Sequence, residues 1–250
     1  MNEIKVPEEN VKTGLTSNAI KLIAIIAMTL DNIAWAFFPH YSLYLPVLLM
    51  KIIGRLTAPI MMFFIAEGYY HTRNLKKYIF RLFVFAIISH FAYAVAFGKN
   101  FIPFKETAFD QTSVIWAFMI GLIALAIMES KTLKMWQKTI IIFPLIWAAF
   151  PADWSCPAAL AVMYMGKYRG NFKKQMISLI ICIAVYSIIY AIFLDVVYGI
   201  IQMLVVLAIP ILYQYNGQRG TWKGMKWLFY IYYPAHMFIL GIIRIFILNK

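Results

Sequence analysis

The sequence predicts an all-α protein, a polytopic transmembrane helical bundle of about nine spans. Hydrophobic residues make up 63% of the 250 residues and charged residues only 13%, where a soluble domain carries roughly 25% charge. The mean hydropathy is +0.76, and apolar windows of about 20 residues, enough to cross a bilayer, recur along the whole chain. These observations exclude an ordinary soluble domain.

Nine apolar segments, separated by polar turns, are the predicted spans. They cover residues 19–39, 49–70, 78–98, 112–129, 137–151, 153–167, 175–194, 197–213 and 227–248. The fifth and sixth are short and form either a tight hairpin or a partly re-entrant pair. Proline inside a helix breaks or kinks it, and this is expected at Pro59, Pro144, Pro157, Pro210 and Pro234. Residues 1–18 form a polar tail, and 19–250 a single membrane domain.

Basic residues follow the predicted topology. The net charge is +13, and 17 of the 23 Lys and Arg residues lie in the N-terminal tail or in alternate loops on the same side. Cytoplasmic loops are enriched in Lys and Arg, so the N-terminus is predicted to be cytoplasmic. Because the charge is segregated in this way, nucleic acid is not expected as a partner.

Few ionisable residues lie within the spans, and Asp31 leads them. An acid at the centre of a bilayer costs about 2.5–3.5 kcal/mol, so it is expected to have a partner and a task. Arg55 in the next span is the expected ion-pair partner. Glu67 is twelve residues beyond Arg55, about 18 Å along a helix, so the two are not expected to pair. Glu67 and His71 are four residues apart and are expected to share a helix face near the cytoplasmic end. His236 follows a proline in the last span.

The basic loops have two interpretations: topology with lipid attraction, or a landing site for a polyanionic ligand such as a nucleotide or coenzyme A. Two glycine-containing loops, 166–170 and 215–220, each place an arginine beside backbone amides that can form a phosphate nest. Cys156 and Cys182 are interpreted as buried small hydrophobes, and no metal-ligand spacing is present.

Several short motifs, which occur in order along the chain, support a resemblance to a known family. They are Leu30-Asp31-Asn32-Ile33, Ile53-Gly54-Arg55-Leu56, Ala66-Glu67-Gly68 and Tyr233-Pro234-Ala235-His236. Over about residues 18–245 the chain resembles the TraX family of membrane acetyltransferases, within the broader transmembrane acyltransferases. The resemblance implies a bacterial inner-membrane enzyme that moves acetyl from cytosolic acetyl-CoA to an extracytoplasmic acceptor, either a pilin N-terminus or a surface glycan.

One position departs from the family. The family's first span reads Asp-His, with the histidine as presumed catalytic base, and this chain has Asn32 there. Asparagine has no titratable nitrogen. Three explanations stay open: an engineered inactivating substitution, a natural non-catalytic relative, or replacement of the base by another histidine, with His236 the candidate.

The resemblance also implies roles for residues. The coenzyme's phosphates are expected at His71, Arg73, Lys76, Lys77, Arg169, Lys173, Arg219 and Lys223, and its thioester is expected to travel up a crevice from the basic face to position 32. There Asp31 would orient the base, Arg55 would neutralise Asp31 or stabilise an oxyanion, and Glu67 would act as a second acid or hold the substrate.

Two rival functions differ in class from the enzyme. A proton-coupled transporter or a lipid or glycan flippase would use Asp31, Glu67 and His236 as a relay. A membrane scaffold for appendage assembly would use the buried charges only to fix helix packing.

Overall fold

A computed structural model describes residues 13–38, 41–102, 105 and 109–248, and within these ranges the regular elements are helices. The only extended pairing that the described residues show consists of isolated bridges. The helices are α1 (Ser17–Phe37), α2 (Leu45–Gly54), α3 (Thr57–His71), α4 (Leu75–Phe97), α5 (Val114–Met128), α6 (Met135–Trp147), α7 (Ser155–Lys167), α8 (Phe172–Phe193), α9 (Val196–Gln202), η1 (Met203–Ala208), α10 (Ile209–Tyr213) and α11 (Met225–Leu248).

The predicted all-α bundle is confirmed, and each of the nine predicted segments is helical. Within the described part of the chain, six helical stretches are long and apolar enough to span a membrane. The apolar helix α5 is shorter, and α6 and α7 have 13 residues each, about 20 Å at the helical rise. The predicted tail 1–18 lies mostly outside the described residues, and α1 begins at Ser17.

Two spans are interrupted, and both interruptions lie at expected prolines. The second span is split into α2 and α3 at Arg55 and Leu56, with Pro59 in the first turn of α3, where a proline is tolerated. The eighth span passes through the 3₁₀ segment η1 just before Pro210. Pro144 and Pro234 lie inside continuous helices.

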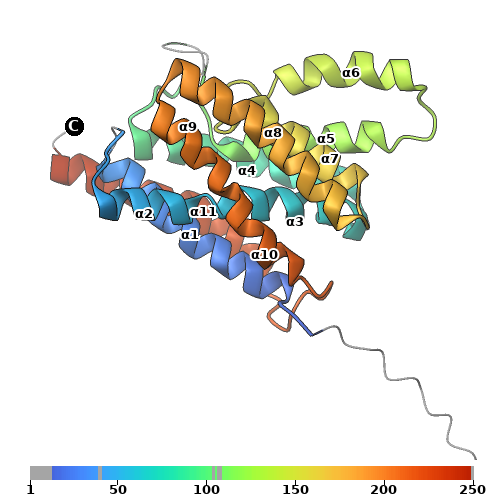
Figure 1. The fold of residues 1–250 in the computed structure, drawn as a ribbon, viewed down its shortest axis with the longest axis horizontal. Helices are drawn as coiled ribbons and strands as arrows, with labels where there is room; N and C mark the ends of the chain where they lie inside the picture. The colour runs from blue at the N-terminus through green and yellow to red at the C-terminus, as the bar shows by residue number, and fades with distance from the viewer. Residues whose placement is uncertain (1–12, 39–40, 103–104, 106–108, 249–250) are drawn as a thin grey trace, which may run out of the picture.

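The short helix α7 lies in the core, whereas α6 lies at the periphery (Figure 1). Ala158, Ala159 and Val162 of α7 are fully buried. A side chain on Gly121 of α5 would meet the Ala159 carbonyl at 2.6 Å, so the two backbones approach as closely as small residues allow. On α6 only Ile142 and Ile146 are buried.

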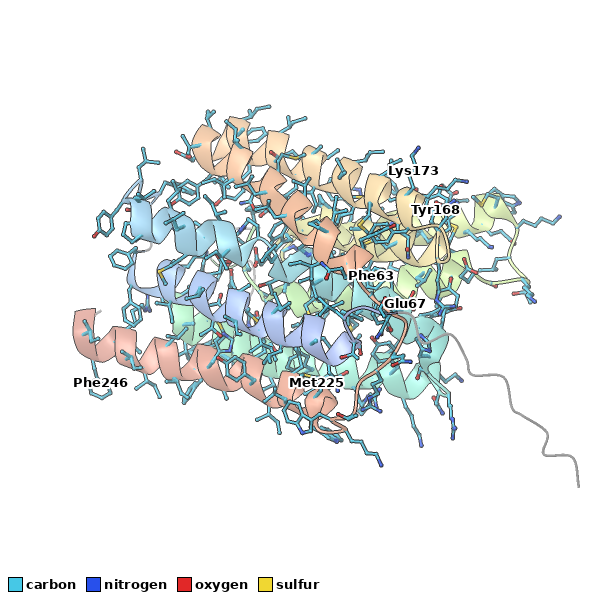
Figure 2. The ribbon with its side chains drawn as sticks, turned by 60° about the horizontal axis from the view of Figure 1, so that its bottom comes forward. Phe63, Glu67, Tyr168, Lys173, Met225 and Phe246 are labelled. Atoms are coloured by element: carbon cyan, nitrogen blue, oxygen red, sulfur yellow. The ribbon has the colours of Figure 1, made fainter. Side chains whose placement is uncertain are left out.

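The helices run along the long axis of the molecule, so their loops collect at two ends (Figure 1). We call the end with loops 72–74, 129–134, 168–171 and 214–224 the basic end, and the end with the described loop residues 41–44, 98–102, 109–113, 148–154 and 194–195 the far end. Glu67, Tyr168 and Lys173 lie at the basic end, away from Phe246 (Figure 2). A cytoplasmic location of the basic end remains a prediction.

The residues before and at the start of α1 pair with the loop that precedes α11. The Leu15 amide donates to the Gln214 carbonyl at 2.7 Å, and the Ser17 amide donates to Gln218 at 2.9 Å. The Asn18 side chain donates to the Trp222 carbonyl at 2.8 Å. This pairing fixes the loop 214–224 against the beginning of the first helix.

Candidate functional site

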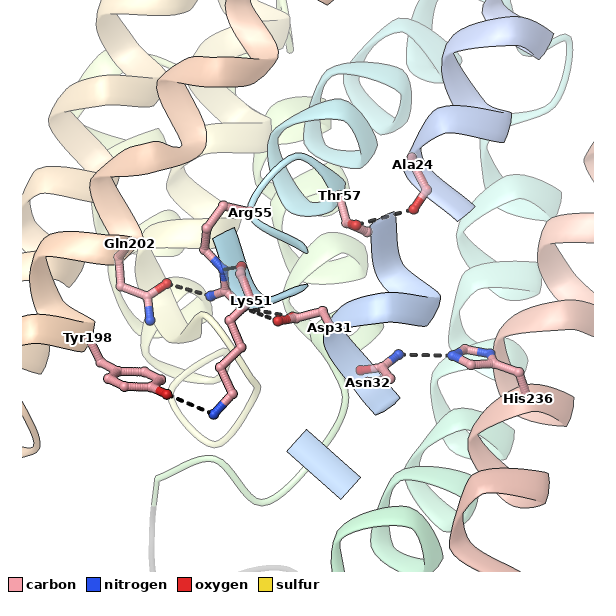
Figure 3. Close-up of polar contacts among 9 residues, drawn as sticks. All are labelled: Ala24, Asp31, Asn32, Lys51, Arg55, Thr57, Tyr198, Gln202 and His236. Atoms are coloured by element: carbon pink, nitrogen blue, oxygen red, sulfur yellow. Dashed lines mark hydrogen bonds and ion pairs between the residues drawn. The ribbon is translucent and has the colours of Figure 1, made fainter. Parts of the chain in front are cut away.

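Asp31 and Arg55 form the predicted ion pair (Figure 3). Arg55 Nη2 donates to both carboxylate oxygens of Asp31, at 2.8 and 2.7 Å. Its Nη1 donates to Gln202 at 2.6 Å and its Nε to the Lys51 carbonyl at 3.1 Å. Because Arg55 stands at the break between α2 and α3, its guanidinium can reach α1 and the end of α9 together.

Gly54 allows this pair to form. A Cβ on Gly54 would lie 2.4 Å from Cβ and Cγ of Asp31, a separation that real atoms do not reach. Replacing Gly54 by alanine should therefore displace Asp31 from Arg55 and lower the free energy of unfolding by about 1–3 kcal/mol. Thermal unfolding in detergent measures this. Ile53→Ala, an exposed neighbour on the same helix, should cost less than about 1 kcal/mol, and equal costs for the two variants would contradict the interpretation.

Sequence reasoning did not find Lys51, which is fully buried. Its ammonium donates to the Tyr198 hydroxyl at 3.0 Å and lies 3.6 Å from the ring centroid of Trp35. The available signal was its position one helical turn before Arg55, on the same face. Gln202, the other partner of this cluster, is uncharged and so gave a weaker signal.

Asn32 contacts His236, the candidate substitute base, across α1 and α11 (Figure 3). His236 Nδ1 lies 2.8 Å from the Tyr232 carbonyl, which can only accept, so Nδ1 carries the proton. His236 Nε2 is then an acceptor, and the Asn32 amide donates to it at 2.9 Å. Neighbouring positions on a helix point about 100° apart, which is why Asp31 faces Arg55 while Asn32 faces His236.

A pocket of about 510 Å³, lined by Asp31, Asn32 and Arg55, lies toward the far end. Two more carboxylates from far-end loops, Asp110 and Asp153, also line it. Asp110 accepts from Lys99 at 3.1 Å and from the Tyr93 hydroxyl. Burial, with the neighbouring Asp110 carboxylate, raises the pKa of Asp153 above its ordinary value. Trp154 and Tyr186 stack in its wall with ring centroids 5.3 Å apart.

A second pocket, of about 600 Å³, opens at the basic end. Five basic side chains line it, and its remaining lining is mostly apolar. The basic ones are Lys21, His71, Arg73, Arg81 and Arg219, and the apolar ones include Met61, Phe64, Leu82, Phe85 and Phe118. Lys21 and Arg81 are among the basic residues of the charge asymmetry, and the sequence analysis assigned neither of them to a ligand site. Lys76, Lys77, Lys173 and Lys223 are exposed and do not line this pocket.

Glu67 lies at the basic end, apart from Asp31, Asn32 and His236. It accepts from Arg169 at 3.0 Å, and the predicted contact with His71 is present at 3.3 Å. A side pocket of about 640 Å³ lies against the basic-end pocket, and both are lined by Glu67, Tyr215 and Gly217. The five expected catalytic residues thus fall into two groups.

The two predicted glycine loops meet at this side pocket. Gly170 and Gly217 both line it, with φ values of +86° and +80°. Nothing lies within 4 Å of a Cβ built on either residue. The left-handed backbone conformation favours glycine, and the open space leaves the backbone of both loops accessible beside Arg169.

Among the residues that the structure describes, the expected single crevice from the basic face to position 32 is replaced by two separate pockets. The basic-end pocket is lined by Phe85 and the far-end pocket by Tyr233, and these two rings pack with centroids 5.9 Å apart. Asp31 and Asn32 line only the far-end pocket of the two. The expectation failed because α4 and α11 pack ring against ring at this level, a contact between segments about 150 residues apart. We call the contact between Phe85 and Tyr233 the aromatic wall.

The fold and the pockets define a multi-pass helical membrane protein with a pocket toward each end of the bundle and an aromatic wall between them. The family described as "TraX protein" matches residues 16–244, and the chain belongs to this family. It is 29% identical over 235 residues to a "Probable fimbrial assembly protein FimC, serogroup H1" of Dichelobacter nodosus, a match that covers 91% of this chain and 95% of that protein. No solved structure matches the chain.

Proposed function

We propose that this protein is an acetyltransferase of the bacterial inner membrane, which takes acetyl from acetyl-CoA at its basic end and delivers it to an acceptor at its far end. The basic end would face the cytoplasm, where acetyl-CoA is made. Membership of the TraX family and the likeness to a probable fimbrial assembly protein support a role in building a surface appendage. A pilin N-terminus or a surface glycan is the proposed acceptor.

The observation that carries the proposal is the make-up of the basic-end pocket. Coenzyme A joins a highly charged phosphate end to a long, thin arm that ends in the thioester. Arg73, Arg219 and Lys21 offer cations for the phosphates, and the apolar lining suits the arm. Its volume of about 600 Å³ is in the range of small-molecule pockets, and the adjoining side pocket gives room for the rest of a large ligand.

The chemistry would fall to His236. Its Nε2 is the unprotonated nitrogen, so it can take the proton of an acceptor amine or hydroxyl once that group displaces the Asn32 amide. The acceptor atom then bonds to the acetyl carbon, the carbon–sulfur bond breaks, and the proton passes to the leaving thiolate. Asn32 itself cannot accept a proton, so we expect slow turnover.

Substitution of a pocket-lining arginine tests donor binding. Arg219→Gln should weaken acetyl-CoA binding about 10-fold, because a charge-assisted contact to phosphate is lost. Titration calorimetry on the full chain in nanodiscs measures this, and the loss should shrink as salt is raised. Lys76→Gln removes the same charge from an exposed side chain outside the pocket and should leave the affinity within about 2-fold. Equal effects of the two variants would mean that only the overall charge attracts the coenzyme.

The same titration separates the rival function. Two pockets divided by a thin wall also suit a proton-coupled transporter or flippase that opens to each side in turn. The parent chain could bind neither acetyl-CoA nor coenzyme A and show flux driven by a pH gradient in proteoliposomes. That result would favour the transporter over the enzyme.

A further inference from the structure

The face of α4 that carries Phe85 runs from the basic-end pocket to the far-end pocket. Phe85 lines the basic-end pocket and Tyr93 lines the far-end pocket. Residues four apart stack on one helix face, so Ser89 lies between these two side chains on the same face. All three are buried, with exposures of 5% for Phe85, 0% for Ser89 and 5% for Tyr93. Ser89 itself lines neither pocket, and a ligand that passed between them along this face would meet it.

Ser89 differs from the other serine and threonine side chains on the described helices, which have hydrogen-bond partners. Thr29, Thr139 and Ser178 each donate to the carbonyl four residues earlier, at 2.8–3.1 Å. The Ser89 hydroxyl has no hydrogen-bond partner among the described residues, although it is fully buried. A buried hydroxyl without a partner is unfavourable, so this group is suited to bind a carbonyl brought by a ligand.

The aromatic wall is thin and consists of side chains that can rotate. Phe85 meets Tyr233 at 5.9 Å with the ring planes 72° apart, and it meets Tyr230 at 4.9 Å with the planes 74° apart. These are edge-to-face contacts. A rotation of Phe85 could admit a group of two carbons, whereas a longer chain would need the space that the ring itself fills. Tyr233 in turn packs on His236, at 5.7 Å, so a group that passes the wall arrives beside the proposed base.

We propose that the aromatic wall is the acyl-binding site, in which Ser89 donates a hydrogen bond to the thioester carbonyl and Phe85 limits the length of the acyl chain. This inference rests on the proposed function. It assigns a positioning residue and a specificity-determining residue that the sequence did not indicate, and it explains how a donor held in the basic-end pocket can present its acyl group to the far-end pocket.

The chain-length limit is tested by shortening Phe85. The full-length protein in nanodiscs is titrated with acetyl-, propionyl- and butyryl-CoA. Wild-type protein should prefer acetyl-CoA over butyryl-CoA by about 10-fold, and Phe85→Ala should reduce that preference to about 2-fold or reverse it, since each methylene that gains an apolar site contributes about 4-fold. Phe80→Ala is the matched control, because Phe80 lies on the same helix and is 65% exposed. It should keep the wild-type preference.

A preference for acetyl-CoA that persists in Phe85→Ala overturns the chain-length limit while the proposed function stands. Should that variant fail to fold, Phe85→Leu makes a smaller opening, and a partial shift toward propionyl-CoA is expected. A parent chain that binds neither acetyl-CoA nor coenzyme A overturns the proposed function and this inference together.

The hydrogen bond is tested with Ser89→Ala. Affinity for acetyl-CoA should fall about 5-fold while affinity for coenzyme A, which lacks the carbonyl, stays the same. The unliganded variant should melt at the parent temperature or above it, because the lost hydroxyl has no partner among the residues that the structure describes. A purely structural serine predicts the reverse pattern: a lower melting temperature and an unchanged ratio of acetyl-CoA to coenzyme A affinity. That result would overturn the assignment.

Discussion

Replacing Asn32 by histidine should raise the rate of acetyl transfer or acetyl-CoA hydrolysis by at least about 100-fold, the usual scale of general-base catalysis. The asparagine amide already lies 2.9 Å from His236 Nε2, in the wall of the far-end pocket. An imidazole there supplies a second titratable nitrogen at the point where the acceptor would enter. Release of free thiol from acetyl-CoA, measured on the full chain in nanodiscs, gives the rate.

Two control variants accompany this prediction. Asn32→Gln keeps an amide and should leave the rate at the parent level, and His236→Ala should lower the slow parent rate further. If Asn32→His folds and binds acetyl-CoA but turns over no faster than the parent, position 32 does not carry a catalytic base in this protein.

Arg55→Met should lower the free energy of unfolding by about 3–5 kcal/mol, because it leaves the Asp31 carboxylate in the bundle without its partner. Arg55 is 5% exposed and also donates to Gln202 and the Lys51 carbonyl, so three helices lose a common contact. The midpoint of thermal unfolding in detergent reports the loss.

The double variant Arg55→Met with Asp31→Asn is the control for that prediction. Removing the stranded carboxylate as well should recover more than half of the lost stability, because the unpaired charge is the main cost. Acetyl-CoA affinity should be similar in the parent and the double variant, since the pair lines the far-end pocket. A double variant no more stable than Arg55→Met would show that lost packing of the arginine stem dominates.

The sequence was sufficient for elements and contacts that depend on local spacing. Apolar length predicted every helical segment. The cost of a lone acid in a span predicted that Asp31 has a partner, and four-residue spacing predicted the contact of Glu67 with His71. The rise of a helix also predicted that Glu67 lies too far from Arg55 to contact it. Glu67 is accordingly separate from Asp31, Asn32 and His236.

The sequence did not predict contacts that depend on which helices pack against each other. The contact of Asn32 with His236 joins residues 204 apart, and a bundle of nine apolar segments gives no local sign of which ones pack together. The position of Lys21 and Arg81 in the basic-end pocket was not predicted, for a different reason. The topology rule already accounted for their charge, so nothing in the sequence separated a pocket-lining cation from an exposed one such as Lys76.

The pairing of the residues at the start of α1 with the loop before α11 has a consequence for biogenesis. The contacts Asn18–Trp222, Thr29–Tyr232 and Asn32–His236 each join residues more than 200 apart. During synthesis Asn18 and Asn32 of the first helix therefore lack these partners until the last helix has been made. Asp31 finds its arginine within 24 residues, so the costliest group of that helix is covered early.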